Sequence, residues 1–166
     1  MARFVVSDAS PLIGLAIVGG LDWLPALFGK VWVPPSVQHE VLPGLQARGE
    51  SEIAQALSQQ YLQLWPHVIP SAPQTLGDLD AGEKDCLSIA LSLPAGQCLV
   101  LMDERAGRAI AKELGIRMAG TAAVIGFAKQ QGRIASAKDC FARLHASDFR
   151  ISKEVIQAVL TQVGEV

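Results

Sequence analysis

Short apolar runs alternate with amphipathic stretches along this chain, and the alternation predicts its elements. Three runs are almost free of charge: residues 3–7 (RFVVS), 31–33 (VWV) and 98–102 (CLVLM). We expect a strand at each of them, and two further short strands at 64–69 and 116–118. The run at 98–102 is apolar at every position, which is typical of a strand with both faces covered.

Helices are expected between these strands, because apolar residues recur there at three- and four-residue intervals. Asp80 and Glu83 have the spacing of a capping box, and Thr121 can cap the helix that follows it. Strands that alternate with helices favour a three-layer α/β fold, in which a mainly parallel sheet carries helices on both faces. The expected helices span 10–18, 36–42, 50–61, 80–93, 104–114, 121–131, 136–145 and 152–163.

The composition is that of a globular protein, with 50% hydrophobic and 18% charged residues among 166. We expect one domain over residues 1–166, large enough to fold without a disulfide or a structural metal. Cys86, Cys98 and Cys140 are widely spaced and include no CxxC pair, which argues against a disulfide framework and a zinc site. Without a signal peptide or an apolar stretch approaching roughly 18 residues, we expect a cytoplasmic protein that is not attached to a membrane.

Charge is distributed unevenly, although the formal net charge is only −2. Residues 1–100 carry four basic and nine acidic side chains, whereas residues 101–150 carry nine basic and five acidic ones. Arg105, Arg108 and Lys112 follow one another at helical spacing and form a basic helix face. That face is either an ordinary solvated surface or a contact for the phosphate backbone of RNA.

Two aspartates stand directly after apolar runs, Asp8 after residues 3–7 and Asp103 after residues 98–102. Ligands of open parallel sheets bind beyond the carboxyl ends of the strands, so the two carboxylates would converge if these strands were neighbours. Clustered carboxylates raise one another's pKa or recruit a cation. Oxygen ligands suit Mg²⁺ or Mn²⁺, and an ion held in this way suits phosphodiester chemistry. The alternative is that each aspartate only caps the helix that follows.

Further carboxylates would come from helices, and the candidates are Glu40 and either Glu83 or Asp85. Positions two apart on a helix point about 200° away from each other, so only one of the last pair is expected to face the site. Because the capping box already gives Glu83 a structural task, we favour Asp85. Glu83 remains the alternative.

Five segments of the chain carry a further signal through their order: SDASPLIGLA, VPPSVQHEV, LDAGEKDCLSIAL, LVLMDERAGRAIAKELGI and AGTAAVIGFAKQQG. Together they resemble the PIN domain family, and within it the VapC-like prokaryotic branch that was long called a domain of unknown function. The closing segment FRISKEVIQAVLTQVGE is similar to the last helix of that branch. The resemblance extends over nearly the whole chain, and its specificity lies in the ordered set.

This resemblance implies a five-stranded parallel sheet and an endoribonuclease that depends on Mg²⁺ or Mn²⁺. It also implies the toxin of a type II toxin–antitoxin system, held in check by a cognate antitoxin protein. The acidic positions of the family fall here on Asp8, Glu40, Asp85 and Asp103, as metal ligands and catalytic residues. Ser10 would orient the first carboxylate.

Other functions also place aspartates at strand ends. A haloacid phosphatase would carry an aspartate where Ser10 stands, and a receiver domain would carry one after its third strand, where residues 67–70 have none. A catalytically silent PIN-like module that acts through a protein partner remains open, although all four acidic positions are filled. The apolar segment 21–28 could serve a homodimer as readily as the core, and we expect a homodimer.

Overall fold

The three apolar runs form the central strands of one sheet. In this computed structural model, which describes residues 2–165, β1 (Phe4–Ser7) pairs in parallel with β2 (Trp32–Val33) on one side and β4 (Cys98–Leu101) on the other. The edge strands are β3 (Gln63–Leu64) and β5 (Arg117–Ala119), which gives the order β3-β2-β1-β4-β5. All pairings are parallel, so the predicted α/β fold is confirmed.

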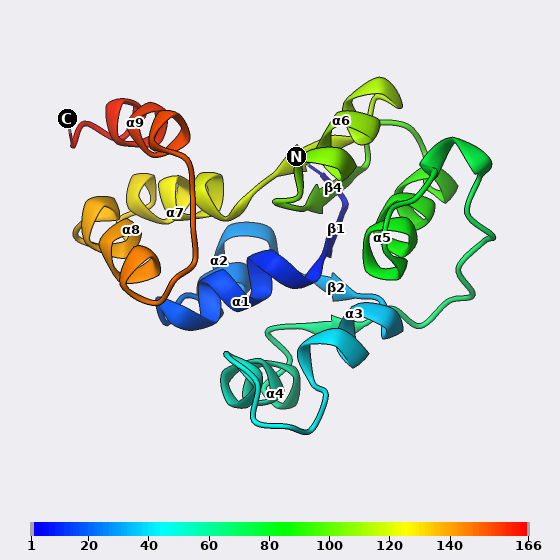
Figure 1. Cartoon of the computed structure of the whole chain (residues 1–166), viewed down its shortest axis with the longest axis horizontal. Coiled ribbons are helices and arrows are strands. Elements are labelled where there is room, and N and C mark those ends of the chain that lie inside the picture. The colour runs from blue at the N-terminus through cyan, green and yellow to red at the C-terminus, as the bar shows by residue number, and fades with distance from the viewer. Residues whose placement is uncertain (1, 166) are drawn as a thin grey trace.

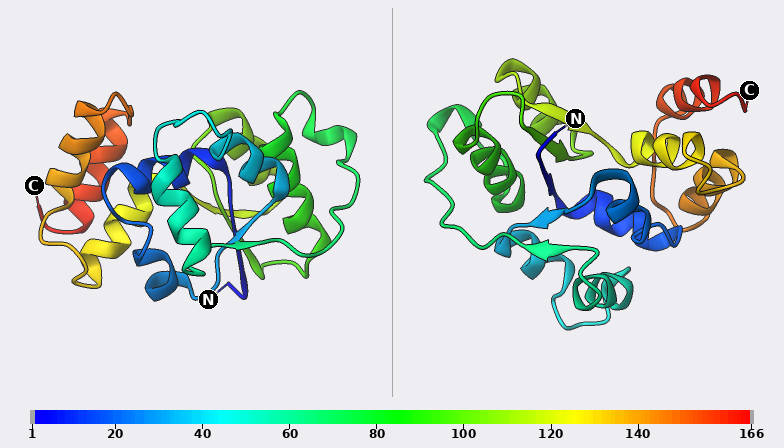
Figure 2. Two further views of the ribbon diagram at one scale, coloured as in Figure 1. Left: turned by 90° about the horizontal axis from the view of Figure 1, so that it is seen from below. Right: turned by 180° about the vertical axis from the view of Figure 1, so that it is seen from behind.

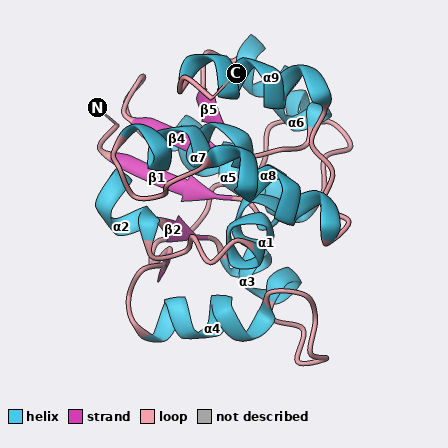
Figure 3. Cartoon of the chain, turned by 90° about the vertical axis from the view of Figure 1, so that its left-hand side faces the viewer, coloured by secondary structure: helices cyan, strands magenta, loops and turns pink. Residues whose placement is uncertain are grey.

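Helices cover both faces of this sheet, as Figures 1 and 3 show. None of the helices described combines the length and the apolar composition that crossing a membrane requires. Their bounds are α1 (Ala9–Ile17), α2 (Trp23–Phe28), α3 (Pro35–Val41), α4 (Glu50–Ser58), the 3₁₀ helix η1 (Gln74–Leu76), α5 (Ala81–Ser92), α6 (Arg105–Glu113), α7 (Thr121–Gln130), α8 (Ala137–Ala146) and α9 (Lys153–Gln162).

Alternation along the strands decides which helix meets which face. Val5 and Leu99 are paired across β1 and β4, and both line a cavity with Phe28 of α2 and Phe127 of α7. Cys98, one position earlier, faces α5 instead. This two-residue period places α5 and α6 on one face of the sheet and α1, α2 and α7 on the other. The helices α8 and α9 pack behind α7, at a distance from the sheet (Figure 2).

The register between β1 and β4 brings the two strand-end aspartates to one edge. Ser7 lies level with Leu101, and the backbone N–H of Asp8 donates to the Leu101 carbonyl at 2.9 Å. Asp103 follows two residues after Leu101. The condition set by the sequence, that the two strands be neighbours, is therefore met.

The segment 21–28 forms α2, a helix that the pattern did not reveal. Trp23, Leu24 and Leu27 are buried in the chain's own core, and the ring of Phe28 packs edge-on against Phe127. Six residues are too few for a helical period to stand out in the sequence. These apolar side chains are used inside the chain, so they no longer argue for a homodimer.

The strand expected at 64–69 is only Gln63–Leu64. The N–H of Trp65 still donates to the carbonyl of Val33 at 2.9 Å, but the next residue, Pro66, has no N–H to offer. The chain leaves the sheet there, and the side chain of Val68 is 94% exposed.

Candidate active site

Asp8 lies at the end of β1 with its side chain only 3% exposed. The carboxylate makes no capping bond to α1, and Oδ1 is buried without a hydrogen-bond partner in the described chain. Burial is the largest cause that raises the pKa of Asp8 to about 7. The backbone N–H of Ala9 lowers this pKa, while the charges of Asp80, Glu40 and Glu104 raise it. The N–H of Ala9 at the start of α1 offsets only part of the cost of burial, so a cation would further stabilise the charge of Asp8.

Glu83 presents a second buried carboxylate, only 6% exposed, in the first turn of α5. Burial is the largest cause that raises the pKa of Glu83 to about 8. A hydrogen bond with the Asp80 side chain and the charges of Asp80, Asp8 and Glu104 raise this pKa further. Its Oε2, like Oδ1 of Asp8, has no partner within residues 2–165. The two orphaned oxygens are the outstanding feature of this edge of the sheet, because buried polar atoms are nearly always paired.

The predicted capping box is only half formed. The N–H of Glu83 donates to Oδ1 of Asp80 at 2.8 Å, so Asp80 starts α5 as expected. The return bond from the N–H of Asp80 to the Glu83 carboxylate is not among the hydrogen bonds of the described residues. The reason for setting Glu83 aside therefore does not hold.

Asp85 is directed to another neighbour. Its Oδ2 accepts a hydrogen bond from Ser36 Oγ of α3 at 2.5 Å, and its charge is not among those that raise the pKa of Asp8, Glu40 or Glu83. The sequence was right that two positions on one helix turn away from each other. The structure favours Glu83 over Asp85 as the neighbour of Asp8, because the charge of Asp8 raises the pKa of Glu83, whereas Asp85 is bonded to Ser36.

Glu40 approaches the same region from α3 and is exposed. Its Oε2 and Oδ1 of Asp8 both lie around Gly82 of α5. Burial, and then the charges of Asp80 and Glu104, raise the pKa of Glu40. The structure therefore brings Asp8, Glu40 and Glu83 together.

Asp103, at the other strand end, is held by donors on both of its oxygens. The backbone N–H of Thr121 donates to Oδ1 at 2.7 Å, and the hydroxyls of Thr121 and Ser10 donate to Oδ2 at 2.6 and 2.9 Å. Ser10 was predicted to orient the first carboxylate, and it orients this one instead. Thr121 was predicted as a helix cap, whereas Gly120 is the N-cap and Thr121 begins α7.

Sequence reasoning missed Asp80 and Glu104 as parts of this acidic region. The sequence pattern indicates Asp80 only as a helix cap and gives Glu104 no role, yet the charges of both raise the pKa of Asp8, Glu40 and Glu83. The available signal was their place in the sequence, within three residues of Glu83 or beside Asp103.

The three basic residues of α6 differ in their surroundings. Arg105 and Lys112 are exposed, whereas Arg108 is half-buried and its Nη1 donates to the carbonyl of Met102 at 3.1 Å. No ion pair of Arg108 is found among residues 2–165. Its guanidinium and the Asp103 carboxylate both lie beside Gly120. Of the three basic side chains, Arg108 therefore reaches the acidic edge, the carboxyl edge of the sheet where Asp8, Glu40, Glu83 and Asp103 lie.

The donor set fits a hard divalent cation in chemistry, although not as a preassembled cage. Within residues 2–165, no three His, Cys, Asp or Glu side chains are placed to hold a metal ion directly. Mg²⁺ usually keeps several waters and takes one or two carboxylates, so the orphaned Oδ1 of Asp8 and Oε2 of Glu83 suffice as direct ligands. The other carboxylates would act through waters.

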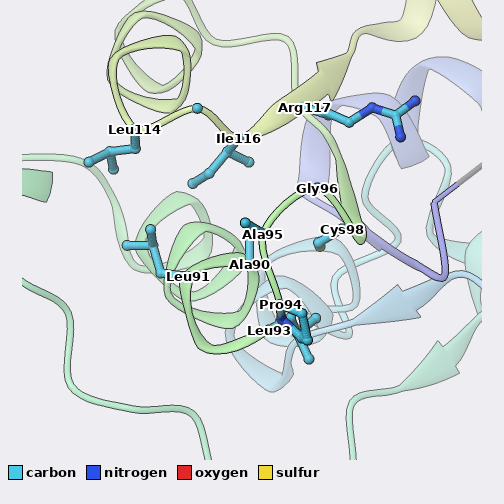
Figure 4. Close-up of a pocket in the computed structure, with 11 residues that line it drawn as sticks. Ala90, Leu91, Leu93, Pro94, Ala95, Gly96, Cys98, Leu114, Ile116 and Arg117 are labelled. Carbon is cyan, nitrogen blue, oxygen red and sulfur yellow. The ribbon is translucent and has the colours of Figure 1, made fainter.

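A separate pocket of about 130 Å³ lies where β4 and β5 begin, at the opposite edge of the sheet from the carboxylates. Figure 4 shows Leu91, Leu114 and Ile116 around this space, with the guanidinium of Arg117 directed away. The side chains that line it are mostly apolar, and none of them is a carboxylate. The chemistry of the chain is therefore concentrated at the carboxyl edge.

Comparison with known proteins gives one positive result. A family model described as a PIN domain matches residues 4–165, a span that includes every strand and helix named above. No curated protein matches the chain.

Proposed function

The chain belongs to the PIN domain family, a family of nucleases, and from this premise we propose that it is a Mg²⁺- or Mn²⁺-dependent endoribonuclease. The observation that carries the proposal is the pair of buried, orphaned oxygens, Oδ1 of Asp8 and Oε2 of Glu83. Two carboxylates kept in this state are costly for the fold, and a divalent cation would remove that cost.

Hydrolysis of a phosphodiester adds water across one P–O bond and returns a proton to the leaving oxygen. A bound divalent cation supplies a Lewis acid that lowers the pKa of water and neutralises phosphoryl charge. Asp8 and Glu83 would hold that ion, with Glu40 and Asp103 around it. The bonds from Ser10 and Thr121 keep Asp103 in one orientation.

The substrate would lie across α6. Arg105, Arg108 and Lys112 would contact the phosphate backbone, and Arg108 is the one that stands beside the carboxylates. Backbone contacts of this kind position the strand without reading its sequence and weaken as salt is added.

The test is cleavage of a single-stranded RNA with Mg²⁺ or Mn²⁺ present, and with EDTA as the metal-free control. We expect Asp8→Asn and Asp103→Asn to abolish cleavage while circular dichroism shows a folded protein. Asp148→Asn, at an exposed position paired only with Arg150, is the matched control and should leave cleavage unchanged. Undiminished cleavage in both site variants would overturn the proposal.

A second candidate is the catalytically silent module that acts through a protein partner. The absence of a preassembled group of three ligands among residues 2–165 favours it. Calorimetric titration with Mn²⁺ separates the two, because the nuclease requires binding at the acidic edge and the silent module does not.

We also propose that the nuclease is the toxin of a type II toxin–antitoxin system, with an antitoxin protein as partner. The support is the ordered resemblance of the sequence to the VapC-like branch. Expression of the chain alone should arrest growth, and co-expression of the product of an adjacent gene should relieve the arrest. Harmless expression of a cleavage-competent protein would remove the toxin role and leave the nuclease standing.

A further inference from the structure

Two helical glycines at the acidic edge have no backbone reason to be glycine. Gly82 and Gly107 lie in the first turns of α5 and α6, and neither has a positive φ. An L residue could therefore adopt either backbone conformation. Glycine is also among the least favourable residues in a helix, so helix propensity does not explain these positions either.

The space that a side chain would take at Gly82 is bordered by carboxylate oxygens. A Cβ there would lie 3.0 Å from Oδ1 of Asp8 and 3.5 Å from Oε2 of Glu40, with Cγ2 of Val37 also at 3.0 Å. Oδ1 of Asp8 is one of the two orphaned oxygens. A methyl group at Gly82 would thus sit against the oxygen that the proposed cation needs.

Gly107 stands in the same relation to the second orphaned oxygen. A Cβ there would lie 2.7 Å from Oε2 of Glu83 and 2.5 Å from Sδ of Met102. Met102 and Glu83 are both buried, so a side chain at Gly107 would press on the core thioether and on the Glu83 carboxylate together. Each of the two orphaned oxygens therefore lies next to a helical glycine, Gly82 of α5 beside Asp8 and Gly107 of α6 beside Glu83.

Gly126, another helical glycine of the chain, is explained by ordinary packing. A Cβ at Gly126 in α7 would meet only Val159 and Val163 of the α9 region, the nearer at 3.1 Å. That glycine allows two helices to approach, and no carboxylate of residues 2–165 lies within 4 Å of the added Cβ. The nearest contact is thus similar at Gly82 and Gly126, at 3.0 and 3.1 Å, but at Gly82 it involves a carboxylate oxygen and at Gly126 only a valine side chain.

We propose that Gly82 and Gly107 are positioning residues for a divalent cation. Their missing side chains let α5 and α6 pack closely over Oδ1 of Asp8 and Oε2 of Glu83 without displacing either carboxylate from the position in which it would bind a cation. The inference rests on the proposed function, because it assigns the space to the cation of that same site.

The experiment measures Mn²⁺ affinity by calorimetric titration, and metal-free thermal unfolding, for the full chain and three variants. We expect Gly82→Ala and Gly107→Ala to weaken Mn²⁺ binding roughly 10- to 100-fold, the range found when groups that orient metal ligands are changed. Gly126→Ala should keep the wild-type affinity. Its metal-free unfolding temperature should nevertheless fall, because the nearest contact of its Cβ, at 3.1 Å, is almost as short as the 3.0 Å contacts at Gly82.

The possible outcomes distinguish a failure of the positioning role from a failure of the proposed nuclease function. If the wild-type chain binds no Mn²⁺, the proposed function fails. If the wild type binds and both Gly82→Ala and Gly107→Ala bind equally well, the nuclease stands and the positioning role is overturned. Equal loss of affinity in Gly126→Ala would also overturn it, as a general effect of destabilisation. If Gly82→Ala does not fold, Gly107→Ala makes the same test. If neither variant folds, both glycines are required for packing, and the role in positioning a cation is overturned.

Discussion

Asp8 and Asp103 occupy equivalent places at the ends of neighbouring strands, yet their carboxylates have opposite surroundings. Asp103 accepts three hydrogen bonds, two from Thr121 and one from Ser10. Asp8 is 3% exposed, leaves Oδ1 without a partner in the described chain, and has its pKa raised to about 7. One strand end is satisfied by the protein itself, and the other is left to be satisfied by a ligand.

The acidic edge therefore has one side that is held by hydrogen bonds and one side, called open here, whose buried oxygens lack partners within residues 2–165. Hydrogen bonds from Thr121 and Ser10 fix Asp103 before any ion arrives, which reduces the cost of ordering a site on binding. The open side consists of Asp8 and Glu83, whose raised pKa values show that the fold disfavours their charged forms. A cation that binds there would stabilise the charged forms of these two carboxylates and so offset the cost of burying them.

The largest expected effect tests whether Glu83 belongs to the open side. We expect Glu83→Gln to lower the rate of metal-dependent RNA cleavage by about 100-fold or more, because a ligand oxygen of full charge is lost. Asp85→Asn, which only weakens a partly buried contact with Ser36 away from Asp8 and Glu83, should change the rate by less than about threefold. Rates from single-turnover assays decide between the two, and equal losses in both variants would return Asp85 to the site.

A smaller effect is expected on the satisfied side. Thr121→Val keeps the shape and the backbone N–H but removes the hydroxyl that donates to Asp103 at 2.6 Å. We expect cleavage to fall roughly 10-fold, at the lower end of the range for groups that orient a metal ligand. Ser10→Ala removes the longer 2.9 Å bond and should cost less. Wild-type rates in Thr121→Val would show that Asp103 does not depend on this support.

The smallest expected effect is on stability against pH. The pKa values of Asp8 and Glu83 are raised to about 7 and 8 in the folded chain, from 3.8 and 4.5, so the folded state binds more protons than the unfolded state between these values. The free energy of unfolding of the metal-free protein should therefore fall as pH rises from about 4 to 8. Asp8→Asn should flatten part of this decline and be more stable than wild type at pH 8, by about 1–2 kcal/mol.

Urea unfolding at several pH values, with EDTA present, measures this dependence. Asp148→Asn serves as the control, because its exposed carboxylate should leave the curve unchanged. Addition of Mn²⁺ at pH 8 should stabilise the wild type more than Asp8→Asn, since binding to the folded state alone raises stability. If the free energy of unfolding of the wild type does not change with pH, the raised pKa values of Asp8 and Glu83 in the folded chain are contradicted.

Much of the fold was predictable because it rests on local patterns. The charge-free runs became the central strands β1, β2 and β4, since strands covered on both faces leave no place for a charge. The end of β3 and the helix α2 were missed. One depended on Pro66, which interrupts a ladder that its neighbours would continue, and the other was too short to show a period.

Local sequence patterns were enough to predict the alternation of strands and helices, the placement of Asp8 and Asp103 at strand ends, and the family. Which carboxylates meet depended on tertiary packing. Glu83 rather than Asp85 turns toward Asp8 because the packing of α5 on the sheet sets the rotation of the helix, and periodicity gives only relative angles. Likewise, Ser10 and Thr121 meet Asp103 across 93 and 18 residues of chain. Such contacts depend on how distant segments are brought together, and no local pattern records them.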